Sequence, residues 1–541
     1  MQLHALAPLF ESRTLLVAAD RPLAVRDFLP AGRRDALTQV LCGVGDVPQL
    51  PDRLAGVPAD GRVDAVVLCV APDALAPTLQ ALSRWRPRAA IVLPHDKDDP
   101  DPSGTAQLCR DWAWQNGCAL LGPNSFGLQR PHAGLNLSQH PTLANQGRVA
   151  LVAQSRAIMA AVMDWAEDVQ IGFSTAVALG DEAVLGLPDV LDFLATDART
   201  DSIALYVEDI GFAREFMSAL RAAASVKPVV VLRAGRSRDP AGADAVFDAA
   251  LRRAGAVRVR YFVQLFSALK VLAYTRRPRG RRIALFSNGS GPPQLALDLM
   301  GEDAPVLPAQ LSAATVRELS GLLGPGAAVA NPVITHAPLD GARTRAVLEC
   351  LLDDPGVDGV LAALAPDPRS DLGGVADCLA AVAPNARKPV ITCLMGDAGM
   401  RPLRRRLDAA GTSAFRTPES AADAFGVLAT HHYNQQLLLQ TQPPVPLGRR
   451  PDLAAARQAI DQARRQGRRT LDVESCRRLL AAFDVHVLVD AEAAAAHRQA
   501  EDALPEAAIR LHTDARFGPV LHLGAGGAGS SLAAADRGMD L

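Results

Sequence analysis

Short apolar runs alternate with amphipathic helical stretches along most of the chain. The apolar runs are Arg62–Val70, Ala89–Leu93, Val149–Ala153, Ile203–Val207, Pro228–Leu232, Arg282–Phe286, Gly359–Leu364 and Pro389–Leu394. The helical patterns between them include Ile158–Ala166, Ala213–Ala224, Phe262–Ala273 and Thr344–Leu352. Continuous apolar runs are typical of parallel strands buried on both faces, and strands that alternate with helices form βαβ units. The pattern predicts an α/β protein with doubly wound parallel sheets.

Short proline- and glycine-rich stretches divide the chain into four segments and a linker. The predicted parts are residues 1–145, 146–277, 278–440, the linker 441–451, and 452–541. The linker is assigned because TQPPVPLGRRP is rich in proline and shows no hydrophobic period. In the last segment, LDVESCRRLLAAF is expected to be a helix that begins at an Asp472 or Thr470 cap.

Composition excludes several classes of protein. The formal net charge of −2 over 541 residues gives no bulk attraction to nucleic acid or to an anionic membrane. No apolar run reaches the roughly 20 residues that span a bilayer, and the first residues show no secretory signal pattern. The eight cysteines form no CxxC pair and are expected to be buried free thiols. A cytoplasmic protein is predicted, with no nucleic-acid or membrane partner.

A series of motifs resembles one enzyme family in its order and spacing. The motifs are GPNSFG (Gly122–Gly127), GRVALVAQSRAIMAAVMDWA (Gly147–Ala166), GFSTAVALGDEA (Gly172–Ala183), ALYVEDI (Ala204–Ile210), KPVVVLRAGRS (Lys227–Ser237), SNGSGPP (Ser287–Pro293) and ANPV (Ala330–Val333). Over about residues 1–438 they resemble the NDP-forming (ADP-forming, succinyl-CoA-synthetase-like) acyl-CoA synthetases. The same architecture occurs in the synthetase-like region of bacterial protein lysine acetyltransferases.

The resemblance implies a fold for each segment and a set of ligands. Residues 1–145 would form a Rossmann-like CoA-binding domain, and 146–277 and 278–440 would form two flavodoxin-like domains of the succinyl-CoA-synthetase type. Residues 452–541 would form a partial ATP-grasp segment, because FGPVLHLGAGGAG (Phe517–Gly529) is similar to part of that fold. The implied ligand is CoA or an acyl-CoA thioester. The implied protein partners are a second copy of the chain, an ATP-grasp chain or an acyltransferase.

Candidate binding residues follow strand ends, where glycine lets the backbone approach a ligand and a helix N-terminus attracts phosphate. The resemblance and this position single out Asp20, Arg21, Pro72, Gly122, Pro123, Asn124, Ser125, Gln154, Ser155, Asn288, Gly289 and Gly291 for CoA or phosphate. Two simpler interpretations stay open: GPNSFG as a Gly-Pro turn, and AQSRAI as a plain helix cap. Arg156 stands where the family has glycine, although arginine itself binds anions.

The chain differs from the family in the residues that transfer the phosphoryl group. Glu208 matches the carboxylate that orients the family's phosphohistidine and is the candidate catalytic residue. The SHTG loop that supplies this histidine is missing after Arg236, and no histidine occurs between His140 and His336. Val17 also replaces a glycine expected near the CoA phosphates.

Support for a nucleotide is weak in the C-terminal segment. Gly524, Gly526 and Gly527 lie in a glycine-rich loop, but such a loop alone is a weak phosphate signal. No lysine follows Lys388, and the segment is shorter than the roughly 200 residues of an ATP-grasp domain, so ATP, ADP and Mg²⁺ have little support as ligands. The chain is expected to be a fragment, a truncated gene product or a changed homologue.

Three functions are compatible with the sequence. The first is a catalytically silent CoA- or acyl-CoA-binding protein of the synthetase type. The second is an active acetate– or acyl–CoA ligase that is completed by a partner ATP-grasp chain. The third is a truncated protein lysine acetyltransferase that retains its acyl-CoA-sensing half.

Overall fold

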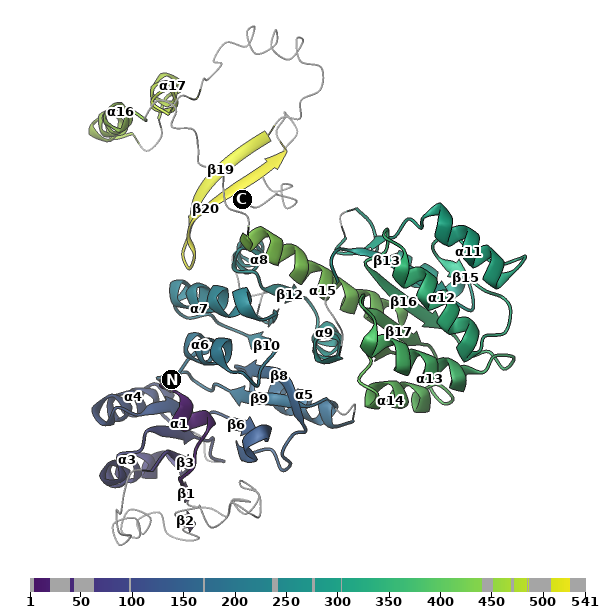
Figure 1. The fold of residues 1–541 in the computed structure, drawn as a ribbon. Coiled ribbons are helices and arrows are strands. Elements are labelled where there is room, and N and C mark those ends of the chain that lie inside the picture. Colours follow the sequence, from purple (N-terminus) through teal and green to yellow (C-terminus); the bar gives the residue numbers. More distant parts are fainter. Residues whose placement is uncertain are drawn as a thin grey trace. The chain divides into compact units, whose positions relative to one another are not determined.

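The computed structural model describes most of the chain and divides it into two compact units, Met1–Leu438 and Leu439–Leu541 (Figure 1). The described residues are 4–19, 39–42, 63–96, 99–168, 171–235, 242–274, 278–302, 304–439, 451–468, 471–483, 485 and 507–525. Asp20, Arg21, Gly526 and Gly527 lie outside them, as does Arg236, after which the family's histidine loop would follow. The chain is a mixed α/β protein, as the apolar runs predict.

The first sheet is parallel throughout, in the order β2-β1-β3-β4-β5. Its strands are β1 (Leu15–Ala19), β2 (Gln39–Cys42), β3 (Ala65–Cys69), β4 (Ala89–Val92) and β5 (Ala119–Leu121). Its helices are α1 (Ala7–Phe10), α3 (Pro72–Leu82) and α4 (Pro102–Asn116). Every residue of β1, β3 and β4 is buried, which explains their uninterrupted apolar sequences.

The second sheet has the order β12-β11-β10-β8-β9-β6-β7. Its strands are β6 (Gly127–Arg130), β7 (Leu135–Ser138), β8 (Gln146–Ala153), β9 (Phe173–Ala178), β10 (Ser202–Val207), β11 (Val229–Arg233) and β12 (Val257–Val259). Its helices are α5 (Arg156–Asp168), α6 (Leu187–Thr196), α7 (Ala213–Val226), α8 (Ala243–Ala254) and α9 (Phe262–Tyr274).

This second sheet is mixed, whereas the apolar pattern predicts a parallel one. β6 pairs antiparallel with both β7 and β9, while β8 to β12 are parallel to their neighbours. The two antiparallel strands come from residues 127–138, which the predicted boundary at residue 145 assigns to the preceding segment. Their sequences, GLQR and LNLS, mix buried polar with apolar residues and therefore lack the continuous apolar run.

The third sheet is parallel, in the order β14-β13-β16-β17-β18, and β15 pairs with β13. Its strands are β13 (Arg282–Ser287), β14 (Leu307–Pro308), β15 (Val333–Ile334), β16 (Gly359–Leu364), β17 (Val390–Leu394) and β18 (Ala414–Phe415). Its helices are α10 (Gly291–Leu297), α11 (Ala313–Leu323), α12 (Gly341–Asp353), α13 (Leu372–Val382) and α14 (Arg401–Ala409).

One long helix, α15 (Pro418–Leu439), packs against both the second and the third sheets of the first unit (Figure 1). Phe425 lies in the apolar cluster of β13 and β16, and Val427 lies in the cluster of β8 and β9. The side-chain amide of Asn434 donates to the carbonyl of Ala256 at 2.7 Å. These contacts join the two α/β layers.

The second unit has two described helices and a hairpin. They are α16 (Leu453–Arg465), α17 (Val473–Ala481), β19 (Ala507–Asp514) and β20 (Gly518–Ala525). Asp472 caps α17, since its side chain accepts a hydrogen bond from the Ser475 amide at 2.8 Å. Gly524 lies in β20. Across the described residues, no helix combines the length and apolarity needed to cross a membrane.

The cysteines whose surroundings are described are free, and all but Cys476 are buried. Burial raises the pKa of Cys109, Cys118 and Cys393 to about 12, so these thiols stay protonated at neutral pH. The buried cysteines therefore fill core space, as the sequence predicts, and Cys476 departs from that prediction because it is partly exposed.

Candidate active-site edge

The three motifs predicted to follow strands lie at the carboxyl ends of strands. GPNSFG begins after β5, Gln154 follows β8, and SNGSGPP begins at the last residue of β13. Ligands of open α/β sheets bind beyond this edge. The fold therefore places the candidate residues at the expected edges of three different parts of the first unit.

Hydrogen bonds join the GPNS turn to the loop after β9. The Asn124 amide donates to the Asp181 carboxylate at 2.5 Å, and the Asp181 backbone amide donates to the Pro123 carbonyl at 2.9 Å. The Ser125 hydroxyl is fully buried and donates to the Ala178 carbonyl at 2.5 Å. Asn124 has a φ of 59°, a left-handed conformation that asparagine tolerates better than most residues. The loops after β5 and β9 thus form one structure.

Gly180 makes the contact between the loops after β5 and β9 possible. Its φ is +72°, and a Cβ added there would lie 2.2 Å from the Pro123 carbonyl oxygen and 2.6 Å from the Ser125 nitrogen. No side chain fits at such distances, so the two backbones can approach only at a glycine.

Gln154 is the centre of a second group of contacts. Its amide nitrogen donates to the Glu182 carboxylate at 2.5 Å and to the Asp209 carbonyl at 2.5 Å. Its amide oxygen accepts from the backbone amides of Glu208 and Asp209, at 2.5 and 2.9 Å. This one side chain therefore joins the ends of β8, β9 and β10.

Glu182 is a functional candidate that the sequence reasoning did not select. It lies in the quoted GDEA motif, has a φ of 51°, and also accepts a hydrogen bond from the Leu187 amide at 3.1 Å. Burial raises its pKa, and the nearby carboxylates of Asp209 and Asp189 act in the same direction. The sequence signal for it was a carboxylate two residues after Gly180, in the loop that follows β9.

Glu208 lies at the end of β10, next to this group. Its carboxylate accepts a hydrogen bond from the Tyr206 hydroxyl at 3.1 Å. Burial raises the pKa of Tyr206 to about 12, and the Glu208 charge adds to the effect. A phenol therefore contacts the carboxylate that, by resemblance, would orient an imidazole.

The N-terminus of α5 follows Gln154 and Ser155. The Ser155 carbonyl accepts from the Met159 amide at 3.0 Å, and its hydroxyl lies 3.5 Å from the Ile158 amide. Arg156, the first residue of the helix, is exposed. Ser155 therefore acts as a weak cap, while Arg156 and the helix N-terminus place positive charge at the sheet edge.

The loop after β13 is organised separately. The Asn288 side chain exchanges two hydrogen bonds with the backbone of Ala365, at 2.8 and 2.9 Å, and so ties the end of β13 to the end of β16. A Cβ added at Gly289 or Gly291 would meet no atom within 4 Å, so both face open space. Within the described residues, no hydrogen bond joins this loop to the Gln154 group.

Comparison with known proteins shows what the chain is similar to. Residues 146–272 match a family described as succinyl-CoA ligase like flavodoxin domain. The chain is 28% identical over 385 residues to acetate–CoA ligase [ADP-forming] I of Archaeoglobus fulgidus, covering 68% of this chain and 55% of that protein. It is also 28% identical over 384 residues to the alpha subunit of acetate–CoA ligase [ADP-forming] II of Pyrococcus furiosus, covering 67% of this chain and 83% of that subunit.

The chain contains a succinyl-CoA ligase like flavodoxin domain and is similar to ADP-forming acetate–CoA ligases.

The fold of this chain agrees with solved structures. The dinucleotide forming acetyl-coenzyme A synthetase 1 of Ca. Korarchaeum cryptofilum, in complex with phosphate and ADP, superposes with a TM-score of 0.70 at 23% identity, covering 81% of this chain and 99% of that chain. The chain spans about half the length of the Archaeoglobus relative and most of the Pyrococcus alpha subunit.

A cavity at the edge of the first sheet has an acidic wall. This cavity of about 470 Å³ lies beyond β3 and β4 and is lined by Pro72, Asp73, Asp99, Pro100, Asp101, Gly104, Thr105 and Leu108. Among these described lining residues, three are aspartates and none is a cation. Carboxylates repel phosphate, so this described wall favours uncharged groups. Arg156 and the N-terminus of α5 add positive charge at the carboxyl edge of the second sheet.

Replacing Glu182 by glutamine is expected to flatten the pH dependence of stability. Because the folded state raises the pKa of this carboxyl, the free energy of unfolding falls as the pH rises from the ordinary value through the raised one. Glu182→Gln removes that titration. The difference between the melting temperatures at pH about 4 and about 8 should shrink relative to wild type. The exposed control Glu215→Gln, on α7, should keep the wild-type difference, and an unchanged difference in Glu182→Gln would contradict the prediction.

Proposed function

We propose that this chain binds CoA or an acyl-CoA thioester at the carboxyl edge of its first two sheets, and that by itself it transfers no phosphoryl group. The proposal depends on the contacts around Gln154. The Gln154 side chain joins the loops after β9 and β10, whereas the neighbouring Glu208 carboxylate accepts a hydrogen bond from a tyrosine. The matches to acetate–CoA ligases support the ligand class.

The residues at this edge favour binding of an anionic thioester. Arg156 and the first turn of α5 present a guanidinium and free backbone amides, which are suited to one phosphate group. The carboxylates Glu182 and Glu208 lie on the neighbouring strand ends and disfavour further anions close to Gln154. We infer that the CoA phosphates lie toward Arg156 and the acyl end toward the GPNS turn.

Phosphoryl transfer lacks its nucleophile. A covalent relay needs a nucleophile that is activated by a nearby base. The segment that matches the succinyl-CoA ligase family, residues 146–272, contains no histidine. The Ser155 hydroxyl lies at the start of α5, but it caps that helix and has no neighbouring base among its hydrogen-bond partners in the described structure.

Calorimetry with acetyl-CoA tests the binding part of the proposal. Arg156→Gln is expected to weaken acetyl-CoA binding by about tenfold, because one charge-assisted phosphate contact is lost. The control Arg221→Gln changes an exposed arginine on α7 and should leave binding unchanged. No binding of CoA or acetyl-CoA to the wild-type chain would refute the proposed function.

Incubation with labelled ATP and Mg²⁺ tests the second part. No label is expected on the purified chain, with or without acetate and CoA. Acid-labile, base-resistant label on the protein would show a phosphohistidine and overturn catalytic silence.

A second candidate function is an alpha-type ligase subunit that works with an ATP-grasp chain. The 83% coverage of the Pyrococcus alpha subunit favours it. Acetyl-CoA synthesis that requires both this chain and an added ATP-grasp chain, and that fails with Glu208→Gln, would establish this candidate instead.

A further inference from the structure

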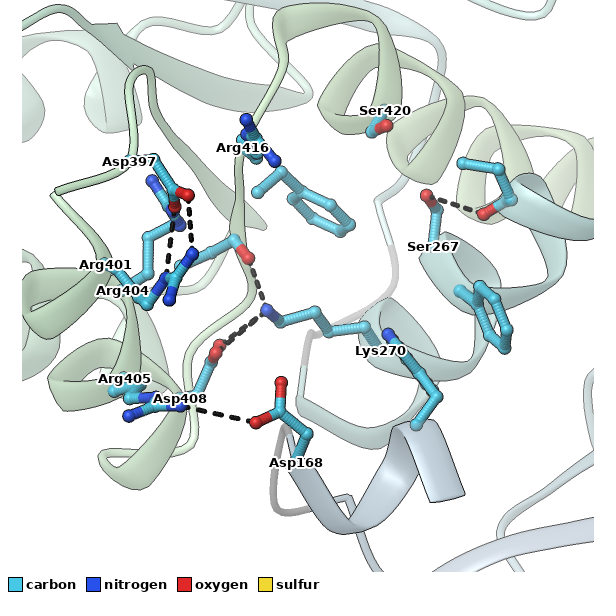
Figure 2. A pocket seen from close by; sticks show the side chains of 15 residues that line it. Asp168, Ser267, Lys270, Asp397, Arg401, Arg404, Arg405, Asp408, Arg416 and Ser420 are labelled. Carbon is cyan, nitrogen blue, oxygen red and sulfur yellow. Dashed lines mark hydrogen bonds and ion pairs between the residues drawn. The ribbon is translucent and has the colours of Figure 1, made fainter. Parts of the chain in front are cut away.

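A second cavity lies between the second and third sheets of the first unit, and it is not part of the strand-edge site (Figure 2). Its volume is about 500 Å³. It is lined by Trp165, Asp168, Val263, Phe266, Ser267, Lys270, Asp397, Arg401, Arg404, Arg405, Asp408, Ala414, Phe415, Arg416 and Ser420. Trp165 and Asp168 belong to the last turn of α5, whereas Arg156 begins that helix. At about 1.5 Å per residue, the helix separates the two sites by more than 10 Å.

The base of the cavity is a buried ion pair that adds no net charge. The Lys270 ammonium lies 2.8 and 2.9 Å from the two oxygens of the Asp408 carboxylate and also donates to the Ala414 carbonyl. Burial lowers the pKa of Lys270 and raises that of Asp408, so each needs the other to stay charged. The pair closes the base of the cavity without attracting an anion.

The wall above this pair carries excess positive charge. Five lining side chains are cationic and three are carboxylates, an excess of two positive charges. The Asp397 carboxylate forms ion pairs with two guanidinium groups, that of Arg401 at 2.5 Å and that of Arg404 at 3.0 Å. Arg405 pairs with Asp168 at 3.3 Å. Two guanidinium charges are therefore not balanced within the cavity.

Arg416 is the most available of these cations. It follows β18, is exposed, and forms no ion pair within the part of the chain that the structure describes. Its charge helps to lower the pKa of Asp397 from a distance. Figure 2 shows Arg416 and Ser420 on one side of the open space, with Ser267 and Lys270 on the other. Ser420 lies in the first turn of the 22-residue helix α15, whose N-terminus adds positive partial charge.

An apolar wall completes the cavity. The Trp165 and Phe266 rings stack with centroids 4.2 Å apart and an interplanar angle of 24°. Val263 is 62% exposed, and the Phe415 ring lies 5.5 Å from the Lys270 ammonium. A flat apolar group can extend this ring stack, since aromatic groups prefer offset stacking at such separations.

We propose that this cavity binds a small organic phosphate, a phosphate monoester on a flat apolar body such as a nucleotide. A phosphate monoester carries close to two negative charges, which matches the unbalanced guanidinium charge. Guanidinium groups bind phosphate through two parallel hydrogen bonds, and about 500 Å³ is an ordinary volume for a ligand of this size. Because its wall comes from α5, α9, α14 and α15, the ligand would join the second and third sheets.

Calorimetry with phenyl phosphate, AMP, CoA and inorganic phosphate tests the proposal on the whole chain. Phenyl phosphate and AMP are expected to bind, while phenol and adenosine are not. Arg416→Gln should weaken the binding of phenyl phosphate and of AMP by about tenfold, because it removes one charge-assisted contact. The matched control is Arg406→Gln on α14, which pairs with Asp377 at 2.7 Å and does not line the cavity; it should bind as wild type does.

A second measurement locates the ligand independently. Phenyl phosphate should change the tryptophan fluorescence of the wild-type chain, and this change should be lost in Trp165→Phe. If Arg416→Gln weakens the binding of CoA as well as that of AMP, the adenine nucleotide end of CoA is a source of the ligand. If it weakens the binding of AMP alone, the ligand is a free nucleotide. Absence of phosphate binding at millimolar concentration, or equal loss in Arg406→Gln and Arg416→Gln, would overturn the proposal. Neither result depends on acetyl-CoA binding near Arg156.

Discussion

Replacing Gly180 by alanine is expected to separate the GPNS turn from the loop after β9 and to abolish acetyl-CoA binding. The added Cβ would lie 2.2 Å from the Pro123 carbonyl oxygen, a backbone atom that cannot turn away as a side chain does. The left-handed conformation of residue 180 costs alanine about 1–2 kcal/mol, and the overpacking adds about 1–3 kcal/mol. Together these effects should lower the free energy of unfolding by about 3 kcal/mol.

Gly211 provides the matched control for this substitution. It also has a positive φ, +54°, but a Cβ added there would meet no atom within 4 Å. Gly211→Ala should cost only the conformational penalty of about 1–2 kcal/mol and should keep acetyl-CoA binding. Urea unfolding and calorimetry measure both effects. A Gly180→Ala protein as stable as Gly211→Ala would show that the two loops are not held together as described, whatever the outcome of the binding experiment.

Replacing Arg130 by methionine is expected to lower the free energy of unfolding at pH 7 by about 3–5 kcal/mol. Arg130 is 2% exposed, and its two terminal nitrogens each donate to one Asp197 oxygen at 2.7 Å. It also donates to the Thr175 hydroxyl at 2.6 Å. Methionine fills similar space but leaves the buried Asp197 carboxylate without its counter-ion, and an uncompensated buried charge is strongly destabilising.

The pH dependence separates this mechanism from simple loss of packing. Burial by itself would raise the pKa of Asp197, but the hydrogen bonds from Arg130 and Thr200 outweigh it and lower the pKa to about 2. The wild-type pair therefore contributes stability above the ordinary carboxyl pKa and loses it as the pH falls through about 2. In Arg130→Met the carboxyl pKa should instead be raised. The difference in free energy of unfolding between variant and wild type should thus be smaller at pH about 4 than at pH about 7.

An exposed pair on neighbouring segments serves as the control. Arg148 and Asp201 form a two-point contact, one hydrogen bond of which is 2.6 Å long, but their side chains are 52% and 55% exposed. Arg148→Met should cost less than about 1 kcal/mol, because water solvates both partners when the pair is broken. Urea unfolding of both variants at the two pH values gives the comparison. Equal destabilisation by Arg130→Met and Arg148→Met would contradict the buried-charge mechanism.

The sequence by itself determined the fold class, the resemblance to the acyl-CoA synthetases and most of the parallel strands. Buried parallel strands such as β3 and β16 need apolar side chains on both faces, so each appears as one continuous apolar run. It also determined that Gly122 and Gln154 follow strands and that Ser287 ends one, because the glycine-rich or polar residues begin where the apolar run stops. Asp472 was foreseen as one of two possible caps, since capping is a local interaction.

Only the tertiary structure decided which of these strand ends act together. Gln154 contacts Glu182, 28 residues away, and Asp209, 55 residues away, while Asn288 bonds only within the third sheet. Antiparallel pairing of β6 with β9 likewise placed residues 127–138 in the second sheet. The arginine-lined cavity is a further case, because its wall gathers side chains from residues 165 to 420. Such contacts depend on how separate layers pack, and neither local propensity nor hydrophobic period records that arrangement.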